Sequence, residues 1–333
     1  MKTLIIAEAG VNHNGNIEQA LKMVDIASEA GANIVKFQTF KAEELVTTKA
    51  QKANYQLKFN PENETQKEML RNLEISDEMH REIFKRCKIK NIEFLSTAFD
   101  PASLKYLLEL GIKRIKIPSG EITNFFLLEE AAIANLDIII STGMCDINDI
   151  EIALDTLIRK GIKKNQITLL QCTTSYPASI VDVNLNVIST LSKTFNVNVG
   201  LSDHTIGINV PIAATALGAT IIEKHFTLDK TQDGPDHKSS LEPAELFSMC
   251  QAIREIDLAM GSNKKAPSKN ELENIIPVRK SLVAKKNIQK GEIFTKKNVT
   301  SKRPGDGITP MRWPEIENKI AKKNYQKDDK IEI

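Results

Sequence analysis

Residues 197–226 read VNVGLSDHTIGINVPIAATALGATIIEKHF and contain the repeating unit of the fold. Two short apolar runs, Val197–Asp203 and Thr220–Phe226, flank a helical pattern over Asn209–Leu217 that ends at Gly218. Apolar runs of this length predict buried strands. A strand, a helix and a second strand in this order predict two parallel neighbours in one sheet, with the helix packed against them.

The same alternation runs through most of the chain. Six further apolar runs come before this unit, at Leu4–Ala9, Ile34–Thr39, Glu93–Phe99, Arg114–Ser119, Asp137–Thr142 and Thr168–Thr173. Helical patterns lie between them, among them Ile17–Ala30, Ser76–Lys90, Pro101–Leu110 and Ile147–Lys160. Strands that are apolar on both faces fit a parallel sheet covered by helices. Eight such units favour a closed (β/α)8 TIM barrel over the alternative, an open doubly wound sheet.

The chain is longer than such a barrel needs. It has 333 residues, whereas a barrel takes about 250. Linker-like composition follows the last helical pattern, so we expect a catalytic barrel over 1–262, a linker over 263–278 and a small β-rich domain over 279–333. The polar connection over 40–75 is long enough to predict a lid or binding loop.

The charges divide unevenly between these parts. Residues 279–333 hold 15 Lys and Arg against 7 Asp and Glu, a net charge of +8, while residues 1–278 carry −6. The basic segment has no recognisable nucleic-acid-binding motif, so nucleic acid is the weaker alternative. We expect the tail to dock on an acidic barrel, either its own or that of a partner chain.

The composition indicates a reducing compartment. The four cysteines lack C-x-x-C spacing, which argues against a disulfide framework or a thiolate zinc site. The apolar start Leu4–Ala7 is shorter than a signal-peptide core, and no run approaches the ~20 apolar residues of a membrane span. We therefore expect a cytoplasmic protein without a membrane partner.

Polar residues collect where the predicted strands end, and in a barrel these carboxyl ends share one cleft. Lys36 and Lys116, together with Ser119 and Ser141, predict a site for a phosphorylated substrate. The physical reason is that ammonium groups neutralise a phosphate dianion while hydroxyls and backbone N–H groups donate to it. The alternative is that each lysine pairs with a structural carboxylate.

His204 and His225 lie at the ends of the predicted strands Val197–Asp203 and Thr220–Phe226. With Glu8 they predict a nitrogen-and-oxygen site for a divalent cation that leaves positions for water and substrate. The alternative is that each histidine is a satisfied structural residue. The residues alone leave open a metal-dependent hydrolase or isomerase on the same barrel, which would not need two phosphate-binding lysines.

Seven motifs, spread over nearly the whole chain, resemble those of the sialic acid synthase family. They are IAEAGVNHNG at 6–15, VKFQTF at 35–40, KIPSGE at 116–121, GLSDHT at 200–205, IEKHFT at 222–227, GPDH at 234–237 and KRPGDGI at 302–308. Two positions depart from the family pattern, because Gln171 and Ser175 stand where close relatives commonly have His and Glu. The departure leaves the choice of sugar near Tyr176 open.

The resemblance implies a TIM barrel followed by an antifreeze-like (SAF) domain that crosses onto the partner barrel of a homodimer. It implies a phosphoenolpyruvate-dependent transferase that forms a carbon–carbon bond. The expected enzyme is N-acetylneuraminate synthase, which condenses phosphoenolpyruvate with N-acetylmannosamine to a nine-carbon 2-keto acid and releases phosphate.

Other activities compete with this expectation. Within the family the alternative is a legionaminic acid synthase, whose substrate is a 6-deoxy 2,4-diacetamido sugar. Pseudaminic acid synthase fits less well. An ice-binding role for the tail is weaker still, because the tail is crowded with lysine instead of regularly spaced threonine.

The resemblance also places the two substrates. Phosphoenolpyruvate is expected among two lysines and three serines, namely Lys36, Lys116, Ser119, Ser141 and Ser202. The sugar is expected beside four residues of the barrel, namely Gln38, Thr174, Tyr176 and Asp236. Arg303 matches a residue that reaches in from the partner chain toward the N-acyl group.

The resemblance finally implies a metal ion and three catalytic residues. His204 and His225, with Glu8 on the metal–water side, are expected to hold Mn²⁺, with Mg²⁺ or Co²⁺ as alternatives. Such an ion polarises the aldehyde oxygen of the sugar. Glu8 and Glu121 are the expected proton-transfer groups, and Lys116 stabilises the charge that grows on the departing phosphate.

Overall fold

The computed structural model describes residues 2–52 and 65–333. The chain forms two compact units, Met1–Gly261 and Ser262–Ile333. In the described part of the chain, no helix combines the length and the apolar character that crossing a membrane requires.

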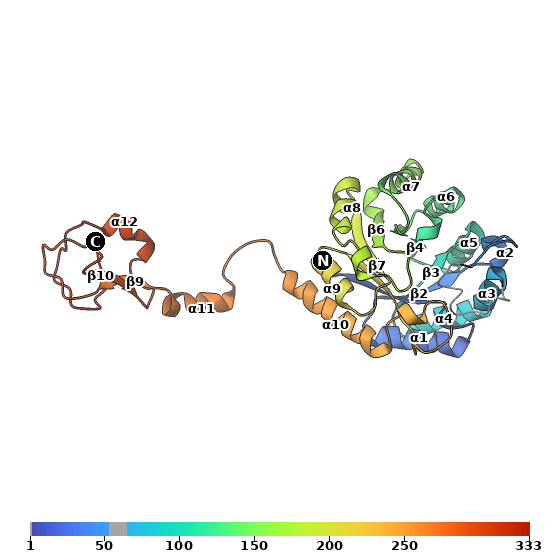
Figure 1. The fold of residues 1–333 in the computed structure, drawn as a ribbon, viewed down its shortest axis with the longest axis horizontal. Helices are drawn as coiled ribbons and strands as arrows, with labels where there is room; N and C mark the ends of the chain where they lie inside the picture. The colour runs from blue at the N-terminus through green and yellow to red at the C-terminus, as the bar shows by residue number, and fades with distance from the viewer. Residues whose placement is uncertain (1, 53–64) are drawn as a thin grey trace. The chain divides into compact units, whose positions relative to one another are not determined.

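The first unit is a closed barrel of eight parallel strands in chain order. The strands are β1 (Leu4–Gly10), β2 (Ile34–Thr39), β3 (Glu93–Ala98), β4 (Arg114–Ile117), β5 (Asp137–Ser141), β6 (Ile167–Cys172), β7 (Asn198–Asp203) and β8 (Ile221–His225). β1 pairs with β2 and with β8, which closes the ring. Figure 1 shows these strands inside a ring of helices. The predicted TIM barrel is confirmed and the open sheet is excluded.

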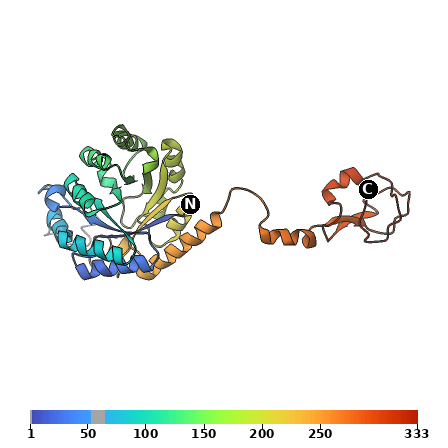
Figure 2. The same cartoon turned by 180° about the vertical axis from the view of Figure 1, so that it is seen from behind.

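Helices cover the outside of the barrel in both views (Figure 1 and Figure 2). They are α1 (Ile17–Glu29), α4 (Asp77–Ile89), α5 (Pro101–Leu110), α6 (Phe125–Ala134), α7 (Ile147–Arg159), α8 (Val187–Phe195), α9 (Asn209–Ala216) and α10 (Pro243–Met260). Short 3₁₀ turns add η2 (Ser119–Glu121), η3 (Lys164–Gln166), η4 (Ile180–Asp182) and η5 (His237–Ser239). Several helices start where the sequence offers a cap, since the side chains of Ser76, Asp100 and Asp146 accept backbone hydrogen bonds from the first turn.

The connection from β2 to β3 contains two short helices, α2 (Ala42–Leu45) and α3 (Gln66–Leu73). α3 begins with a capping box between Thr65 and Glu68. The lid or binding loop predicted over 40–75 is therefore partly helical, and its residues 53–64 lie outside the described residues.

Alternate residues of the strands point into the barrel and form two layers. The lower layer is a buried apolar plug made of Ile6, Ile34, Leu95, Ile139, Leu170 and Ile221. The upper layer lies two residues further along the strands and is polar, with Glu8, Lys36, Thr97, Lys116, Ser141, Cys172, Ser202 and Glu223. β7 has Gly200 in the lower layer, because a Cβ there would lie 2.3 Å from the carbonyl oxygen of Ile221. The plug closes the barrel below, so the polar layer lies at the bottom of an open cleft.

The second unit begins with α11 (Lys269–Val278), inside the segment that was expected to be a linker. It continues with β9 (Ser281–Ala284), β10 (Val299–Lys302), η6 (Pro310–Arg312) and α12 (Trp313–Ile316). β9 and β10 pair in antiparallel fashion. A separate core holds the unit together, made of Leu282, Ala284, Ile288, Phe294, Val299, Ile316, Ala321, Tyr325 and Ile331. The antiparallel pair agrees with the small β-rich domain that the sequence predicts.

Candidate active site

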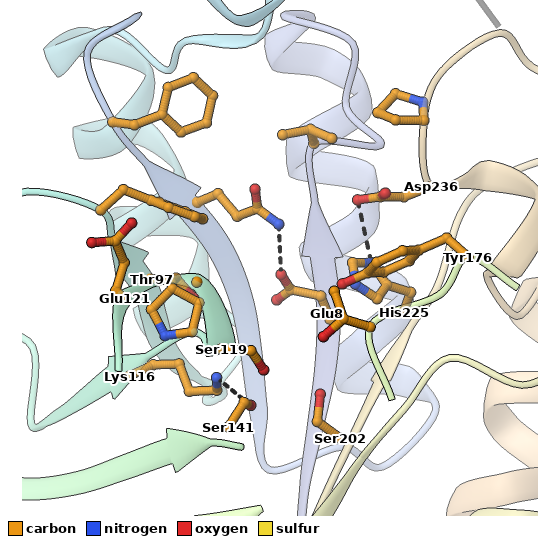
Figure 3. A pocket seen from close by; sticks show the side chains of 18 of the residues that line it. Glu8, Thr97, Lys116, Ser119, Glu121, Ser141, Tyr176, Ser202, His225 and Asp236 are labelled. Atoms are coloured by element: carbon orange, nitrogen blue, oxygen red, sulfur yellow. Dashed lines mark hydrogen bonds and ion pairs between the residues drawn. The ribbon is translucent and has the colours of Figure 1, made fainter. Parts of the chain in front are cut away.

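A cavity of about 350 Å³ opens at the carboxyl ends of the barrel strands. Thirteen of the residues predicted for the site line it, namely Glu8, Lys36, Gln38, Lys116, Ser119, Glu121, Ser141, Thr174, Tyr176, Ser202, His204, His225 and Asp236. Figure 3 shows side chains of the lining, among them Glu8, Lys116 and Asp236, which come from several strands and from the segments that follow them. Arg303 belongs to the second unit, where its Nε donates to the carbonyl of Val278 at 3.0 Å.

Four buried charged residues form the bottom of the cavity, and we call Glu8, Lys36, Lys116 and Glu223 the charged floor. Nζ of Lys36 lies 2.8 Å from Oε2 of Glu8 and 3.7 Å from Oε2 of Glu223. Nζ of Lys116 lies 3.9 Å from Oε1 of Glu223. The alternative that the lysines pair with carboxylates is thus partly realised, but those carboxylates line the same cavity. Two ammonium groups side by side remain available to an incoming anion.

The protonation of the charged floor is set by burial and by these neighbours. Burial raises the pKa of Glu8 to about 7, with Lys36 opposing the rise and Glu223 adding to it. Burial opposes the charge on Lys36, but the attraction of Glu223 and Glu8 outweighs it and raises the pKa. Burial lowers the pKa of Lys116, which Glu223 only partly offsets. A carboxyl group that titrates near neutrality beside two lysines can give or accept a proton in a reaction.

Hydroxyl groups surround the two lysines. Nζ of Lys36 donates to Oγ1 of Thr97 at 2.8 Å, and Nζ of Lys116 donates to Oγ of Ser141 at 2.7 Å. Oγ of Ser119 accepts from the backbone N–H of Gly143 at 2.9 Å. A Cβ at Gly143 would lie 2.1 Å from Oγ1 of Thr174, so only glycine lets this loop come so close. Ammonium groups and hydroxyls in this arrangement suit a small phosphorylated anion.

The structure brings the two predicted histidines together. Their ring centroids are 5.4 Å apart, and the ring of Tyr176 lies 4.2 Å from that of His204. Nδ1 of His204 donates to the carbonyl oxygen of Thr173 at 2.8 Å, which leaves Nε2 as the nitrogen with a free lone pair. Nδ1 of His225 is buried without a hydrogen-bond partner in the described residues, and Oδ2 of Asp236 lies 3.7 Å away.

Two imidazole nitrogens therefore fit a divalent cation, but a third protein ligand is not in place. Burial lowers the pKa of His225 well below its usual value, so this ring is neutral and able to bind a metal. Among residues 2–52 and 65–333 no group of three or more His, Cys, Asp or Glu could hold a metal ion. Glu8 is committed elsewhere, since it pairs with Lys36 and accepts from Nε2 of Gln38 at 3.2 Å. Such a site would leave most coordination positions to water and substrate.

Two more carboxyl groups line the cavity. Burial raises the pKa of Asp236 to about 6. Burial also raises the pKa of Glu121, while Nδ2 of Asn124, which donates to it at 2.7 Å, opposes the rise. Asp236 lies on the histidine side of the cavity and Glu121 on the opposite side, beside Lys116 (Figure 3).

Sequence reasoning missed Glu223, although a signal for it was present. Residues two apart on a strand share a face, so Glu223 must point to the same side as His225. Its Oε1 accepts from Oγ of Ser202 at 3.0 Å, and this bond joins β8 to β7 inside the barrel. The two lysines lower the pKa of Glu223 against the effect of burial, so it stays ionised.

Apolar residues on one side of the cavity were missed as well. We call Val11, Phe40, Met69, Leu70, Leu73 and Phe99 the apolar wall; all six line the cavity. They come from the segments that follow β1, β2 and β3 and from α3, and they form one hydrophobic cluster. The sequence predicted a lid or binding loop over 40–75, but it gave no polar signal that singled out these apolar side chains, and the folded chain shows that they border the cleft.

Comparison with known proteins agrees with this geometry. The model of the NeuB family matches residues 23–265, and the model of the SAF domain matches residues 279–331. The chain belongs to the NeuB family. The predicted family resemblance is therefore confirmed, and so is the predicted SAF domain.

The chain is similar in sequence to several named proteins of this family. The chain is 54% identical to an N,N'-diacetyllegionaminic acid synthase of Campylobacter jejuni over 99% of both chains. It is 47% identical to the protein of the same name from Legionella pneumophila over 95% of this chain and 89% of that one. It is 36% identical to the human N-acetylneuraminate-9-phosphate synthase, over 98% of this chain and 90% of that one.

A solved structure of the family is also similar. It is the N-acetylneuraminic acid synthetase of Leptospira borgpetersenii in complex with citrate, which is 37% identical with a TM-score of 0.73. The match covers 83% of this chain and 90% of that chain.

Proposed function

We propose that this protein is an N,N'-diacetyllegionaminic acid synthase, which condenses phosphoenolpyruvate with a 6-deoxy 2,4-diacetamido sugar and releases phosphate. The observation that carries the proposal is the 54% identity over 99% of both chains to a protein of that name. N-acetylneuraminate synthase, the first expectation from the sequence, belongs to the same family but has weaker support. Legionaminic acid synthase, the alternative within the family, is therefore favoured.

The charged floor supports the placement of phosphoenolpyruvate. This substrate carries a phosphate and a carboxylate, and Lys36 and Lys116 offer two ammonium groups, with Ser119, Ser141 and Ser202 nearby to donate. The lysines would stabilise the charge that grows as phosphate departs. Glu8, whose pKa is about 7, can take a proton from the water that adds to C2 and return it later.

We propose that His204 and His225 bind a divalent ion, with Mn²⁺ the first choice and Mg²⁺ or Co²⁺ next. When bound, such an ion supplies Lewis-acid polarisation of the sugar aldehyde. Replacing His204 by Ala should abolish condensation. It should also remove the Mn²⁺-dependent rise in melting temperature that we expect for the wild type. An unchanged rise in the variant would show that the ion binds elsewhere.

We propose further that the enzyme is a homodimer in which Arg303 completes the sugar site of the partner barrel. The proposal is supported by the family resemblance and by the opposite charges of the two parts, +8 over 279–333 and −6 over 1–278. The four cysteines are free thiols, which agrees with a reducing compartment, and we infer a cytoplasmic location.

A sugar panel tests the function directly. The protein is incubated with phosphoenolpyruvate, Mn²⁺ and either the 6-deoxy 2,4-diacetamido sugar or N-acetylmannosamine, and phosphate release and product mass are measured. The proposal expects phosphate release that requires sugar and is faster with the diacetamido sugar. Faster reaction with N-acetylmannosamine would return the assignment to N-acetylneuraminate synthase. Phosphate release from phosphoenolpyruvate alone would favour a hydrolase.

A further inference from the structure

The charged floor and the apolar wall are two chemically different parts of the cavity surface, and the apolar wall carries no charge. The charged floor holds Lys36 and Lys116 deep in the barrel. The apolar wall borders the same cavity with aliphatic and aromatic side chains from the segments that follow the first three strands. A ligand that fills the cavity therefore needs an anionic part at the floor and an apolar part at the wall.

The helix α3 presents its apolar face to the cavity because of its sequence period. Met69, Leu70 and Leu73 recur at the spacing of one helical face. Lys67 precedes them and Arg71 lies between them in sequence, and both pair instead with Glu43 of α2. The positive charges of α3 are thus taken up by Glu43, and the helix borders the cavity with no charged group, offering Met69, Leu70 and Leu73 and, at its first residue, the neutral amide of Gln66.

The wall is held in place by contacts outside the cavity. The backbone N–H of Ala42 donates to Oε1 of Glu74 at 2.7 Å, which ties the start of α2 to the end of α3. Phe40 and Phe99 meet edge to face with ring centroids 5.8 Å apart. A surface that is fixed before the substrate binds can distinguish substrates by shape and polarity.

We propose that the apolar wall selects the sugar by binding the methyl groups of its distal end, the C6 methyl and the methyl of the 4-acetamido group. This inference rests on the proposed function and specifies which residues choose the substrate. Phosphoenolpyruvate and the aldehyde belong at the floor and the histidines, so the far end of the open-chain sugar extends toward the wall. N-acetylmannosamine would place hydroxyl groups at C4 and C6 there, and against the six apolar side chains of the wall these would lose water without gaining a hydrogen-bond partner.

Leu70 is the residue to change, because it is half-buried in the wall and its replacement by Asn keeps the size of the side chain. The Leu70→Asn variant should lose roughly tenfold in kcat/KM for the diacetamido sugar. For N-acetylmannosamine kcat/KM should stay level or rise, and the KM for phosphoenolpyruvate should not change. Leu70→Ala, which shortens the side chain without adding polarity, should lose less with the diacetamido sugar and keep the preference.

A matched control is Leu258→Asn on α10, where the leucine is 82% exposed and is not among the residues that line the cavity. It should leave the kinetics with both sugars unchanged. Equal losses with both sugars in Leu70→Asn and Leu70→Ala would overturn the inference, and so would no loss with either. A wild type that fails with the diacetamido sugar refutes the proposed function itself, so the two failures are told apart by which protein shows them.

Discussion

Glu223 and Lys224 are consecutive buried charges on β8, and they belong to two groups of charges that face opposite sides of the strand. Glu223 of the charged floor points into the barrel, lines the cavity, and has one oxygen without a hydrogen-bond partner among the described residues. Lys224 points outward, where Nζ lies 2.5 Å from Oδ2 of Asp203 and also contacts the carbonyl of Thr205. Asp203 in turn accepts from the N–H and the hydroxyl of Thr205, both at 3.0 Å.

The difference shows that burial of charge does not by itself mark an active site. Both groups are removed from water, but Lys224 and Asp203 form an ion pair with each other and hydrogen bonds with Thr205. The charged floor borders a cavity and keeps groups that a substrate can engage. The outward pair should therefore matter for stability, and the inward lysines should matter for catalysis.

The largest effect is expected where the outward pair is broken. Lys224→Met leaves Asp203 buried without its cation, which should cost about 3–5 kcal/mol of unfolding free energy. Urea unfolding measures the loss, and activity should fall only in proportion to the folded fraction. A stable but inactive variant would show that Lys224 acts with the charged floor in catalysis.

The inward counterpart is Lys116→Met. We expect a loss of roughly 10²–10³-fold in kcat, because the charge that grows on phosphate loses its ammonium partner. Stability should change little, since Glu223 keeps Lys36 as a neighbour. The exposed Lys113 on the same segment is the control, and Lys113→Met should keep the wild-type rate. Loss of folding without loss of rate per folded molecule would argue against the assignment.

A pH effect is expected from His80, another buried group on the outer side of the barrel. Its Nδ1 donates to the carbonyl of Ser76 at 3.1 Å, and its Nε2 accepts from the hydroxyl of Thr39 at 2.8 Å, so the neutral ring is satisfied. Burial lowers the pKa from 6.5 to about 4. The unfolded chain takes up the proton first, so this contribution to stability is complete above pH 6.5 and declines down to pH 4.

The unfolding free energy that His80 contributes should fall by about 3 kcal/mol over this range, because each unit of difference between the unfolded and folded pKa corresponds to ~1.4 kcal/mol. Unfolding free energies at pH 7, 5.5 and 4 measure it, with His80→Gln as the comparison. The variant should be less stable at pH 7 and lose less on acidification. Parallel curves for the two proteins would show that His80 does not carry the effect.

The smallest effect is expected for Arg303→Ala, which tests whether the cavity is completed by the second unit. The KM for the sugar should rise roughly tenfold, because a charge-assisted hydrogen bond to the acyl group is lost. The KM for phosphoenolpyruvate should stay unchanged. The neighbouring Lys302, which pairs with Asp328, provides the control variant Lys302→Ala. An equal rise in both KM values would contradict a role confined to the sugar.

The sequence predicted what depends on periodicity and strand ends. Eight apolar runs with helices between them were sufficient for the barrel, and the rule that strand ends converge was sufficient to gather Lys36, Lys116 and His204. Glu223 was within reach of the same rule, since it lies two residues before His225. The apolar wall was not, because Leu70 and Phe99 resemble ordinary core residues until the fold places a cavity beside them.

The apolar plug below the charged floor affects the order in which the two substrates can bind. Ile6, Leu95, Leu170 and the other plug residues fill the barrel axis, so the cleft is closed below the charged floor. Under the proposed function, phosphoenolpyruvate belongs at the bottom and the sugar nearer the opening. The smaller substrate must then enter before the larger one, and a bound sugar prevents its escape. Under the proposed function, the enzyme should therefore bind its two substrates in a fixed order, with phosphoenolpyruvate first.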